Sequence, residues 1–330
     1  MRLNPAGPRV SIVVCARNAE DDLVECLESL AAQDYRDIEI VVVNDASNDA
    51  TGDLARRFQE RAARDVILIS NLANLGVAGS RNVGIGRAGG EITAFTDADC
   101  VAAPDWISEL VKGYDFGEAS AVGGSISDPP RLNYWQLADK SSNFVARAEG
   151  PVGYIQGCNM SFDSAVLKKH MFNAEIKYGY EEALLCDSLV EEGARIYFRP
   201  QAVVLHKHRS APAGLLKQKY LRGLSSIWYR KTRKKFPIFK RHLALLLAVL
   251  ALVFSPWSRL SVLISAVLFL ALCLSLVSDE IRYRRKSAAE ILITFPAVLF
   301  LEAAHFAGSM AGLVRFWVLP MISFGRRPAF

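Results

Sequence analysis

Two aspartates, Asp97 and Asp99, follow an apolar run at 92–96 that is typical of a buried strand. Alternate residues of an extended segment point to the same side, so the two carboxylates face one way. Oxygen ligands of this kind suit Mg²⁺ or Mn²⁺, either of which can bridge to a diphosphate. The tripeptide alone also fits a pair of solvated or capping aspartates, and its surroundings have to decide between the two.

Other polar residues also follow apolar, β-branched runs. Asn18, Asp45 and Asn74 each come shortly after such a run, and stretches with helical spacing separate the runs. The runs are 10–15, 38–43, 66–69 and 92–96. Strands that alternate with helices predict an α/β fold with a largely parallel sheet, in which ligands bind beyond the carboxyl ends of the strands. We therefore expect these polar side chains to gather at one edge of the sheet.

Four segments, 11–18, 40–47, 74–82 and 95–99, have the order and spacing seen in the family 2 glycosyltransferases. The resemblance covers about residues 11–208. It implies a GT-A-type, Rossmann-like fold with a mixed, mostly parallel sheet. It also implies an enzyme of the hexosyltransferase type that takes a sugar from a nucleotide-sugar donor, with UDP-sugars expected.

The resemblance assigns nucleotide-side roles to several residues. Asp45 resembles the aspartate that hydrogen-bonds the donor base, and Asn18, Asn74 and Arg81 resemble further contacts to the nucleotide sugar. Without the resemblance, Asp45 reads as a turn cap and Arg81 as a charge on a helix surface. Asn44 and Ala46 depart from the usual Asp-Asp-Gly pattern but leave Asp45 in place.

The metal site follows from the same resemblance. Asp99 resembles the direct metal ligand, and Asp97 resembles the residue near the ribose and the metal. His206 resembles a histidine that closes such sites near the diphosphate, with His208 as a substitute. A lone histidine is also often structural. The expected cofactor is Mg²⁺ or Mn²⁺.

The general base is expected near Tyr180, where the family usually has Gly-Glu-Asp and this chain has Tyr-Glu-Glu. Glu182 aligns with the catalytic carboxylate, and Glu181 is the alternative base. Both glutamates would also suit the exposed start of a helix. Upstream, Gly157 and Asn159 belong to a segment that resembles the acceptor side of the family's site.

The last third of the chain differs in composition. Segments 243–254 and 260–277 are apolar and uncharged, and basic clusters at 230–241 and 282–286 flank them, which predicts a membrane hairpin over 242–278. A third apolar stretch, 288–320, fits a further span or an interfacial helix equally well. We expect a transferase domain at 1–211, an amphipathic interfacial region at 212–241 and a membrane region at 242–330.

The net charge of +5 in 330 residues comes from these flanking clusters, which favours membrane lipids as a partner and argues against nucleic acid. Residues 1–8 have no apolar signal core, so the catalytic domain is expected on the cytoplasmic side of the inner or plasma membrane. The six cysteines show no CxxC pair and are expected to be buried, reduced thiols rather than a zinc or redox site.

These features together predict an inverting, metal-dependent transfer of one sugar to a membrane-associated, lipid-linked saccharide in polysaccharide or glycolipid biosynthesis. The Gln-x-x-Arg-Trp signature of processive synthases is absent. A sugar nucleotidyltransferase would need a Gly-rich phosphate loop where this chain has Ala16-Arg17-Asn18. The remaining alternative is a catalytically inactive membrane scaffold of a polysaccharide assembly complex, which would explain Tyr180.

Overall fold

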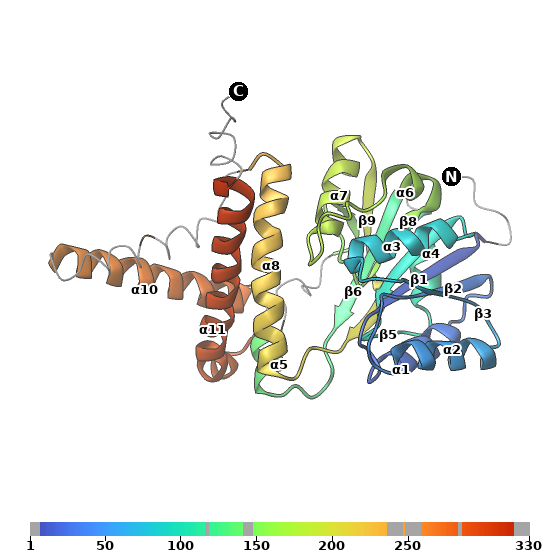
Figure 1. The fold of residues 1–330 in the computed structure, drawn as a ribbon, viewed down its shortest axis with the longest axis horizontal. Helices are drawn as coiled ribbons and strands as arrows, with labels where there is room; N and C mark the ends of the chain where they lie inside the picture. Colours follow the sequence, from blue (N-terminus) through green and yellow to red (C-terminus); the bar gives the residue numbers. More distant parts are fainter. Residues whose placement is uncertain are drawn as a thin grey trace, which may run out of the picture. The chain divides into compact units, whose positions relative to one another are not determined.

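A computed structural model describes residues 7–115, 119–140, 148–235, 247, 259–282 and 286–319. The chain forms two compact units (Figure 1). The first comprises residues 1–131 and 146–208, and the second comprises residues 132–145 and 209–330. The candidate site residues all belong to the first unit.

The first unit is built on one nine-stranded sheet in the order β3-β2-β1-β4-β8-β6-β9-β5, with β7 paired to β9. The parallel part consists of β1 (Val10–Ala16), β2 (Ile38–Asn44), β3 (Asp65–Ser70) and β4 (Ile92–Asp97). The remaining strands are β5 (Cys100–Ala102), β6 (Ala119–Ser127), β7 (Gly150–Val152), β8 (Met160–Asp163) and β9 (Arg195–His206). β8 joins the two halves because it pairs antiparallel with both β4 and β6. The predicted mixed, mostly parallel sheet is confirmed.

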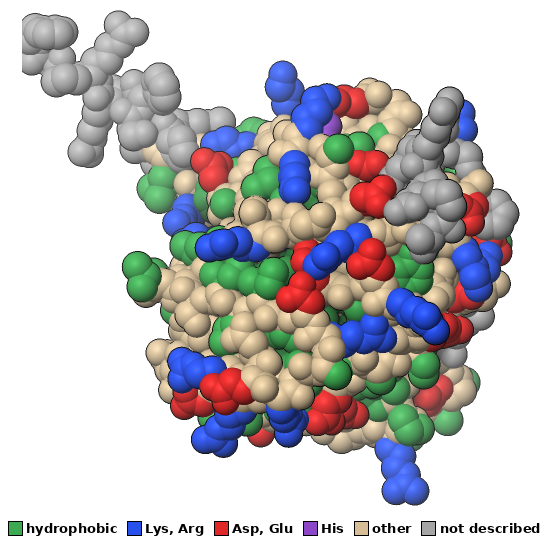
Figure 2. Space-filling model, turned by 90° about the vertical axis from the view of Figure 1, so that its right-hand side faces the viewer, with side chains coloured by type: hydrophobic (Ala, Val, Ile, Leu, Met, Phe, Trp, Pro, Cys, Tyr) green, Lys and Arg blue, Asp and Glu red, His purple; other side chains and the backbone are tan. Residues whose placement is uncertain are grey.

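Helices cover both faces of this sheet. β1 and β2 are buried along almost their whole length, as strands covered on both faces must be. The helices of the first unit are α1 (Leu23–Ala31), α2 (Thr51–Arg61), α3 (Gly76–Arg87), α4 (Trp106–Lys112), α6 (Ser164–His170) and α7 (Glu181–Glu191). One core cluster joins Val13 and Phe95 of the sheet to Ile85 of α3 and Leu185 of α7. On the face of the molecule in Figure 2, acidic and basic side chains are interspersed rather than segregated.

The second unit contains α5 (Tyr134–Asp139), α8 (Pro212–Thr232), α10 (Arg259–Arg282) and α11 (Ala288–Leu313), and a π-helical turn, η3 (Val314–Val318), continues α11. Glycines let α8 and α11 approach closely. A Cβ on Gly223 would collide with the His305 carbonyl oxygen, and a Cβ on Gly308 would collide with the Tyr220 carbonyl oxygen. Contacts between small residues of this kind are typical of helices that pack in a membrane.

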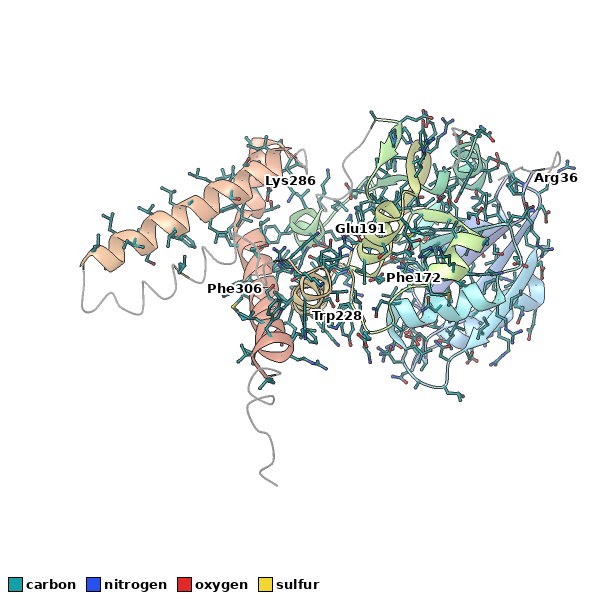
Figure 3. The ribbon with its side chains drawn as sticks, turned by 90° about the horizontal axis from the view of Figure 1, so that it is seen from above. Arg36, Phe172, Glu191, Trp228, Lys286 and Phe306 are labelled. Carbon is teal, nitrogen blue, oxygen red and sulfur yellow. The ribbon has the colours of Figure 1, made fainter. Side chains whose placement is uncertain are left out.

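Within the described residues, two helices are long and apolar enough to cross a membrane. In α10 the window Val262–Asp279 has a mean hydropathy of 2.4, and only 11% of it is buried. Its side chains project on both sides of the helix (Figure 3). The window Ala288–Val318 has a mean hydropathy of 1.7 and is 39% buried, because α11 packs against α8 and α5. Two apolar helices are thus present in the C-terminal part of the chain that the structure describes.

The first half of the predicted hairpin, 243–254, and its turn at 255–258 lie outside the described residues except for position 247. The same holds for 236–241 of the predicted interfacial region. α8 forms the described part of that region, and α10 covers the predicted second segment of the hairpin.

Candidate functional site

The loops after β1 and β2 are tied to each other. The Asn18 backbone N–H donates to Ser47 Oγ at 3.1 Å, and the Asn48 backbone N–H donates to Asn18 Oδ1 at 2.9 Å. Asn18 and Ala46 both have a φ of 51°, in the left-handed region. Asparagine tolerates this conformation better than alanine does, so the backbone at Ala46 is strained.

Asp45 is buried and holds the start of α3. Its Oδ1 accepts hydrogen bonds from Asn71 Nδ2 at 2.9 Å and from the Leu75 N–H at 2.8 Å, and its Oδ2 accepts from the Gly76 N–H at 3.0 Å. Asn74 Oδ1 also accepts from the Gly76 N–H, at 2.9 Å. Asp45 therefore shapes the loop after β3 through the same carboxylate that is expected to bind the donor base.

Arg81 lies inside the protein, with 3% of its side chain exposed. The interpretation as a helix-surface charge is therefore wrong. Nη1 donates to Glu181 Oε1 at 2.7 Å, and Nη2 donates to Asp97 Oδ1 at 3.1 Å and to the Gly157 carbonyl oxygen at 3.0 Å. The guanidinium also lies over the Phe95 ring. Arg81 thus connects three segments of the site and offers a ligand almost no surface of its own.

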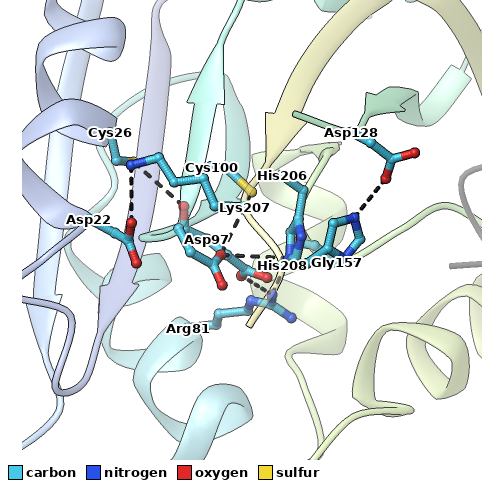
Figure 4. A network of polar contacts seen from close by, with 11 residues as sticks. Asp22, Cys26, Arg81, Asp97, Cys100, Asp128, Gly157, His206, Lys207 and His208 are labelled. Atoms are coloured by element: carbon cyan, nitrogen blue, oxygen red, sulfur yellow. Dashed lines mark hydrogen bonds and ion pairs between the residues drawn. The ribbon is translucent and has the colours of Figure 1, made fainter. Parts of the chain in front are cut away.

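The expected metal ligands come together. Asp97, Asp99 and His206 each present a donor atom within 4.8 Å of the others, and Figure 4 shows Asp97, His206 and Arg81 in this cluster. His206 Nε2 lies 3.7 Å from Asp99 Oδ1. Burial and the neighbouring Asp97 raise the pKa of the Asp99 carboxyl, and His206 opposes the rise. Because a bound cation would relieve this crowding of negative charge, the donor set fits Mg²⁺ or Mn²⁺.

His208, the suggested substitute, is engaged elsewhere. It is buried, and its Nε2 lies 2.6 Å from Asp128 Oδ1. Its ring stands edge-on to the His206 ring, with centroids 5.2 Å apart. His208 therefore packs behind His206 and supports it from the side of Asp128.

The two glutamates at the start of α7 differ sharply. Glu181 is buried against Arg81, and burial followed by the nearby Glu182 charge raises its pKa to about 8, although Arg81 opposes the rise. Glu182 Oε1 accepts a hydrogen bond from the Tyr154 hydroxyl at 2.7 Å. The Oε2 atoms of both glutamates are buried, with no hydrogen-bond partner in the described part of the chain. Neither glutamate therefore merely solvates the helix start.

Tyr180 precedes these glutamates with a φ of 74°. Glycine adopts this backbone conformation at little cost, whereas a residue with a side chain is strained there. Tyr180 thus adopts the left-handed conformation that the glycine expected from the resemblance would adopt at little cost.

The two acceptor-side residues have structural partners. The Gly157 carbonyl oxygen accepts from Arg81, and a Cβ at this position would lie 3.1 Å from Arg81 Nη2. The Asn159 side chain is fully buried between strands: Trp106 Nε1 donates to its Oδ1 at 2.8 Å, and its Nδ2 donates to the carbonyl oxygens of Ser125 and Ala202. Their role toward an acceptor stays a prediction, and their contacts are those of residues that position the site.

Sequence reasoning missed several residues of this cluster. Tyr154 lies in an irregular segment that carries no periodic signal. Lys207 directly follows His206, and its Nζ lies 3.0 Å from Asp22 Oδ1 (Figure 4). Its side chain also pairs with Glu25. A systematic reading of strand ends would have found Lys207. Nothing in the spacing pointed to Tyr154.

The chain is similar to known glycosyltransferases. Residues 11–172 match the family model described as glycosyl transferase family 2. An uncharacterized glycosyltransferase of Haemophilus influenzae is 40% identical over 118 residues, which is 36% of each chain, so this chain spans little more than a third of that relative. A glucosyl-dolichyl phosphate glucuronosyltransferase of Haloferax volcanii is 30% identical over 220 residues, which is 60% of this chain and 69% of the relative.

Among solved structures, a mannosyltransferase from Pyrobaculum calidifontis in complex with GDP-Man and Mn²⁺ superposes with a TM-score of 0.60. The superposition covers 94% of this chain and 88% of the other, at 20% sequence identity. At this level of identity the likeness establishes a shared fold.

Proposed function

The chain belongs to glycosyl transferase family 2, and from this premise we propose that it transfers one sugar from a nucleotide-sugar donor to a lipid-linked saccharide with inversion at the anomeric carbon. The observation that carries the proposal is the convergence of Asp97, Asp99 and His206 on one point of the sheet edge. Arg81 ties that point to the start of α7, where Glu182 presents a carboxylate oxygen with no hydrogen-bond partner in the described chain.

Asp99, Asp97 and His206 would hold the divalent cation. When bound, the cation supplies Lewis-acid stabilisation of the negative charge that grows on the leaving diphosphate. Two carboxylates suit either Mg²⁺ or Mn²⁺, and the imidazole favours Mn²⁺, since nitrogen ligands bind it better than they bind Mg²⁺. The Mn²⁺ in the mannosyltransferase complex supports the same preference.

Glu182 acts as the general base and takes the proton from the acceptor hydroxyl. The Tyr154 hydroxyl fixes one carboxylate oxygen, which leaves Oε2 to accept the proton. Glu181 serves a different purpose, because its carboxyl is engaged by the buried guanidinium of Arg81. A single displacement of this kind inverts the anomeric configuration, since the acceptor attacks the face opposite the departing diphosphate.

The nucleotide is proposed to lie over the loops after β1, β2 and β3. Asp45 is the proposed contact to the base, with Asn18 and Asn74 beside it. Their side chains accept hydrogen bonds from the backbone N–H groups of Asn48, Leu75 and Gly76, which hold this surface in place before the donor arrives and lower the entropy lost on binding. A UDP-sugar is the proposed donor.

The acceptor is proposed to be membrane-bound. α10 presents apolar side chains over most of its surface, and the Haloferax relative is named for a sugar carried on dolichyl phosphate. The basic flanks of the predicted hairpin support a catalytic domain on the cytoplasmic side of the membrane. We retain the division into a transferase domain at 1–211, an interfacial region at 212–241 and a membrane region at 242–330 as part of this proposal.

A donor and acceptor screen tests the proposal. The full chain in lipid nanodiscs is incubated with Mn²⁺, a panel of UDP- and GDP-sugars, and polyprenyl diphosphate-linked saccharides. Release of nucleoside diphosphate together with a lipid-extractable product of inverted anomeric configuration is expected for one donor. Asp99→Asn is the matched control. Nucleotide binding without transfer for any pair would instead favour the inactive-scaffold alternative.

A further inference from the structure

A second group of metal-binding atoms lies beside the first. Cys100, Cys158 and His206 each place one donor atom within 4.8 Å of the others. The strand register explains part of this arrangement, because Cys100 of β5 pairs directly across from His206 of β9. Cys158 follows Gly157, whose carbonyl oxygen is held by Arg81. Three separate segments therefore bring these side chains together.

The chemistry of this second group differs from that of the first. Both cysteines are buried, and their side chains are hydrogen-bonded to each other. Thiolate and imidazole are the ligands that Zn²⁺ prefers, with Zn–S distances of about 2.3 Å and Zn–N distances of about 2.0 Å. Two sulfurs around one tetrahedral zinc lie about 3.8 Å apart. The donor atoms of this group all lie within 4.8 Å of one another, so small side-chain shifts would bring them to ligand distance. Asp99 Oδ1 lies 3.9 Å from Cys100 Sγ and offers a fourth ligand.

We propose that Cys100, Cys158 and His206 bind Zn²⁺ and that this ion inhibits transfer by withdrawing His206 from the catalytic cation. On binding, each thiol gives its proton to solvent as its Zn–S bond forms. His206 belongs to both groups of ligands, so an ion at one competes for it with an ion at the other. The two groups sort ions by type, because carboxylates favour Mg²⁺ and Mn²⁺ whereas thiolates favour Zn²⁺. The inhibitory consequence rests on the proposed function, and the binding site itself does not.

The binding site is tested spectroscopically on the full chain without donor or acceptor. Co²⁺ is the probe because it occupies zinc sites and reports tetrahedral thiolate coordination through visible bands and a sulfur-to-metal charge-transfer band. We expect these bands in the wild type, loss of the charge-transfer band in Cys158→Ser and Cys100→Ser, and displacement of Co²⁺ by Zn²⁺. The matched control is Cys186→Ser, which replaces another buried thiol, in α7, and should keep the bands.

Unchanged bands in Cys158→Ser, or no bands in the wild type, would overturn the site. Cys158→Ala serves as a second variant if serine disturbs packing. Since this measurement needs no turnover, it stands even if no donor supports transfer.

The inhibitory role is tested by titrating Zn²⁺ into the transfer reaction at saturating Mn²⁺. We expect the inhibitory Zn²⁺ concentration to rise at least about 10-fold in Cys158→Ser, because losing a ligand weakens a metal site by at least this factor. Cys186→Ser should match the wild type. Equal Zn²⁺ sensitivity of Cys158→Ser and wild type would show that Zn²⁺ acts elsewhere, and the proposed inhibition would be wrong.

Discussion

Two regions of the first unit differ in how far their polar groups are hydrogen-bonded. The first region consists of the loops after β1, β2 and β3, and the second consists of the segments that carry Asp97, Glu181 and Glu182. In the loops, Asp45 accepts three hydrogen bonds and Asn18 joins two loops. At the start of α7, two buried carboxylate oxygens have no hydrogen-bond partner within the described residues.

The polar side chains of the first region are therefore hydrogen-bonded within the protein, whereas those of the second region keep acceptor atoms for a ligand. Buried polar atoms are almost always hydrogen-bonded in folded proteins, and exceptions mark strain, catalysis or an absent ion. The loops would therefore need little rearrangement to bind the nucleotide of the proposed donor. The carboxylates of the second region have capacity left for a cation and for a proton in transfer.

The largest effect on turnover is expected at Asp99, whose carboxylate lies close to that of Asp97. Asp99→Asn should lower turnover about 10³-fold, which corresponds to the several kcal/mol that a metal ion contributes to transition-state stabilisation. Stability should not fall, because burial and Asp97 already disfavour the charge on Asp99. Turnover and thermal unfolding are measured together, with the exposed Asp53→Asn as control. Chelation by EDTA should abolish transfer in the wild type, and full activity without metal would contradict the account.

Arg81→Met probes the link between the two regions. It leaves the buried Glu181 and the partly exposed Asp97 without the guanidinium that binds both, and losing hydrogen bonds to a buried charged group costs about 1.5–3 kcal/mol. Chemical unfolding in detergent measures the loss. The control Arg61→Met removes a surface pair with Glu28 and should cost no more than about 1 kcal/mol. Similar losses in both variants would mean that Arg81 does not hold the site together.

Much of the first region was readable from the sequence. The apolar runs before Asn18, Asp45 and Asn74 predict strands because β-branched residues favour buried parallel strands, and the carboxyl ends of such strands meet at one edge. The inward position of Arg81 was not readable. Its partner Glu181 lies 100 residues away, and α3 has no strong apolar stripe to show which of its faces is buried.

The geometry of the second region could be predicted only in part from the sequence, because it depends on an unusual backbone conformation and on contacts between residues far apart in the chain. Tyr180 stands where the resemblance leads one to expect glycine, so the sequence did not indicate that this residue has a φ of 74°. The approach of Cys100 to Cys158 depends on the pairing of β5 with β9 and on the loop before β8, and no spacing rule links the two cysteines.

Asp45→Asn tests whether the hydrogen bonds to the Asp45 carboxylate hold the loops in the conformation that binds the donor. The amide keeps the size of the side chain but turns one acceptor into a donor facing a backbone N–H, which costs about 1–3 kcal/mol. We expect UDP affinity, measured by calorimetry, to fall about 10-fold or more. Turnover at saturating donor should change little. The control is Asp65→Asn at the opposite end of β3, and an unchanged UDP affinity in Asp45→Asn would remove Asp45 from the donor site.

A further prediction concerns the pH dependence of stability. Because burial raises the pKa of Glu181 to about 8, the folded protein keeps a proton that the unfolded chain releases near the ordinary value of 4.5. This contribution to stability is complete below about pH 4.5 and is lost as the pH rises to about 8. Glu181→Gln should therefore show a flatter dependence of unfolding free energy between these values. A slope equal to that of the wild type would mean that Glu181 is ionised throughout.

The central claim is that Glu182, and not Glu181, removes the proton from the acceptor. The most direct test compares turnover and nucleotide affinity in Glu182→Gln and Glu181→Gln, two isosteric changes at adjacent positions. The account predicts that Glu182→Gln lowers turnover about 10²- to 10⁴-fold with donor affinity unchanged, while Glu181→Gln has a much smaller effect on turnover. Near-normal turnover in Glu182→Gln, or a collapse confined to Glu181→Gln, would contradict it.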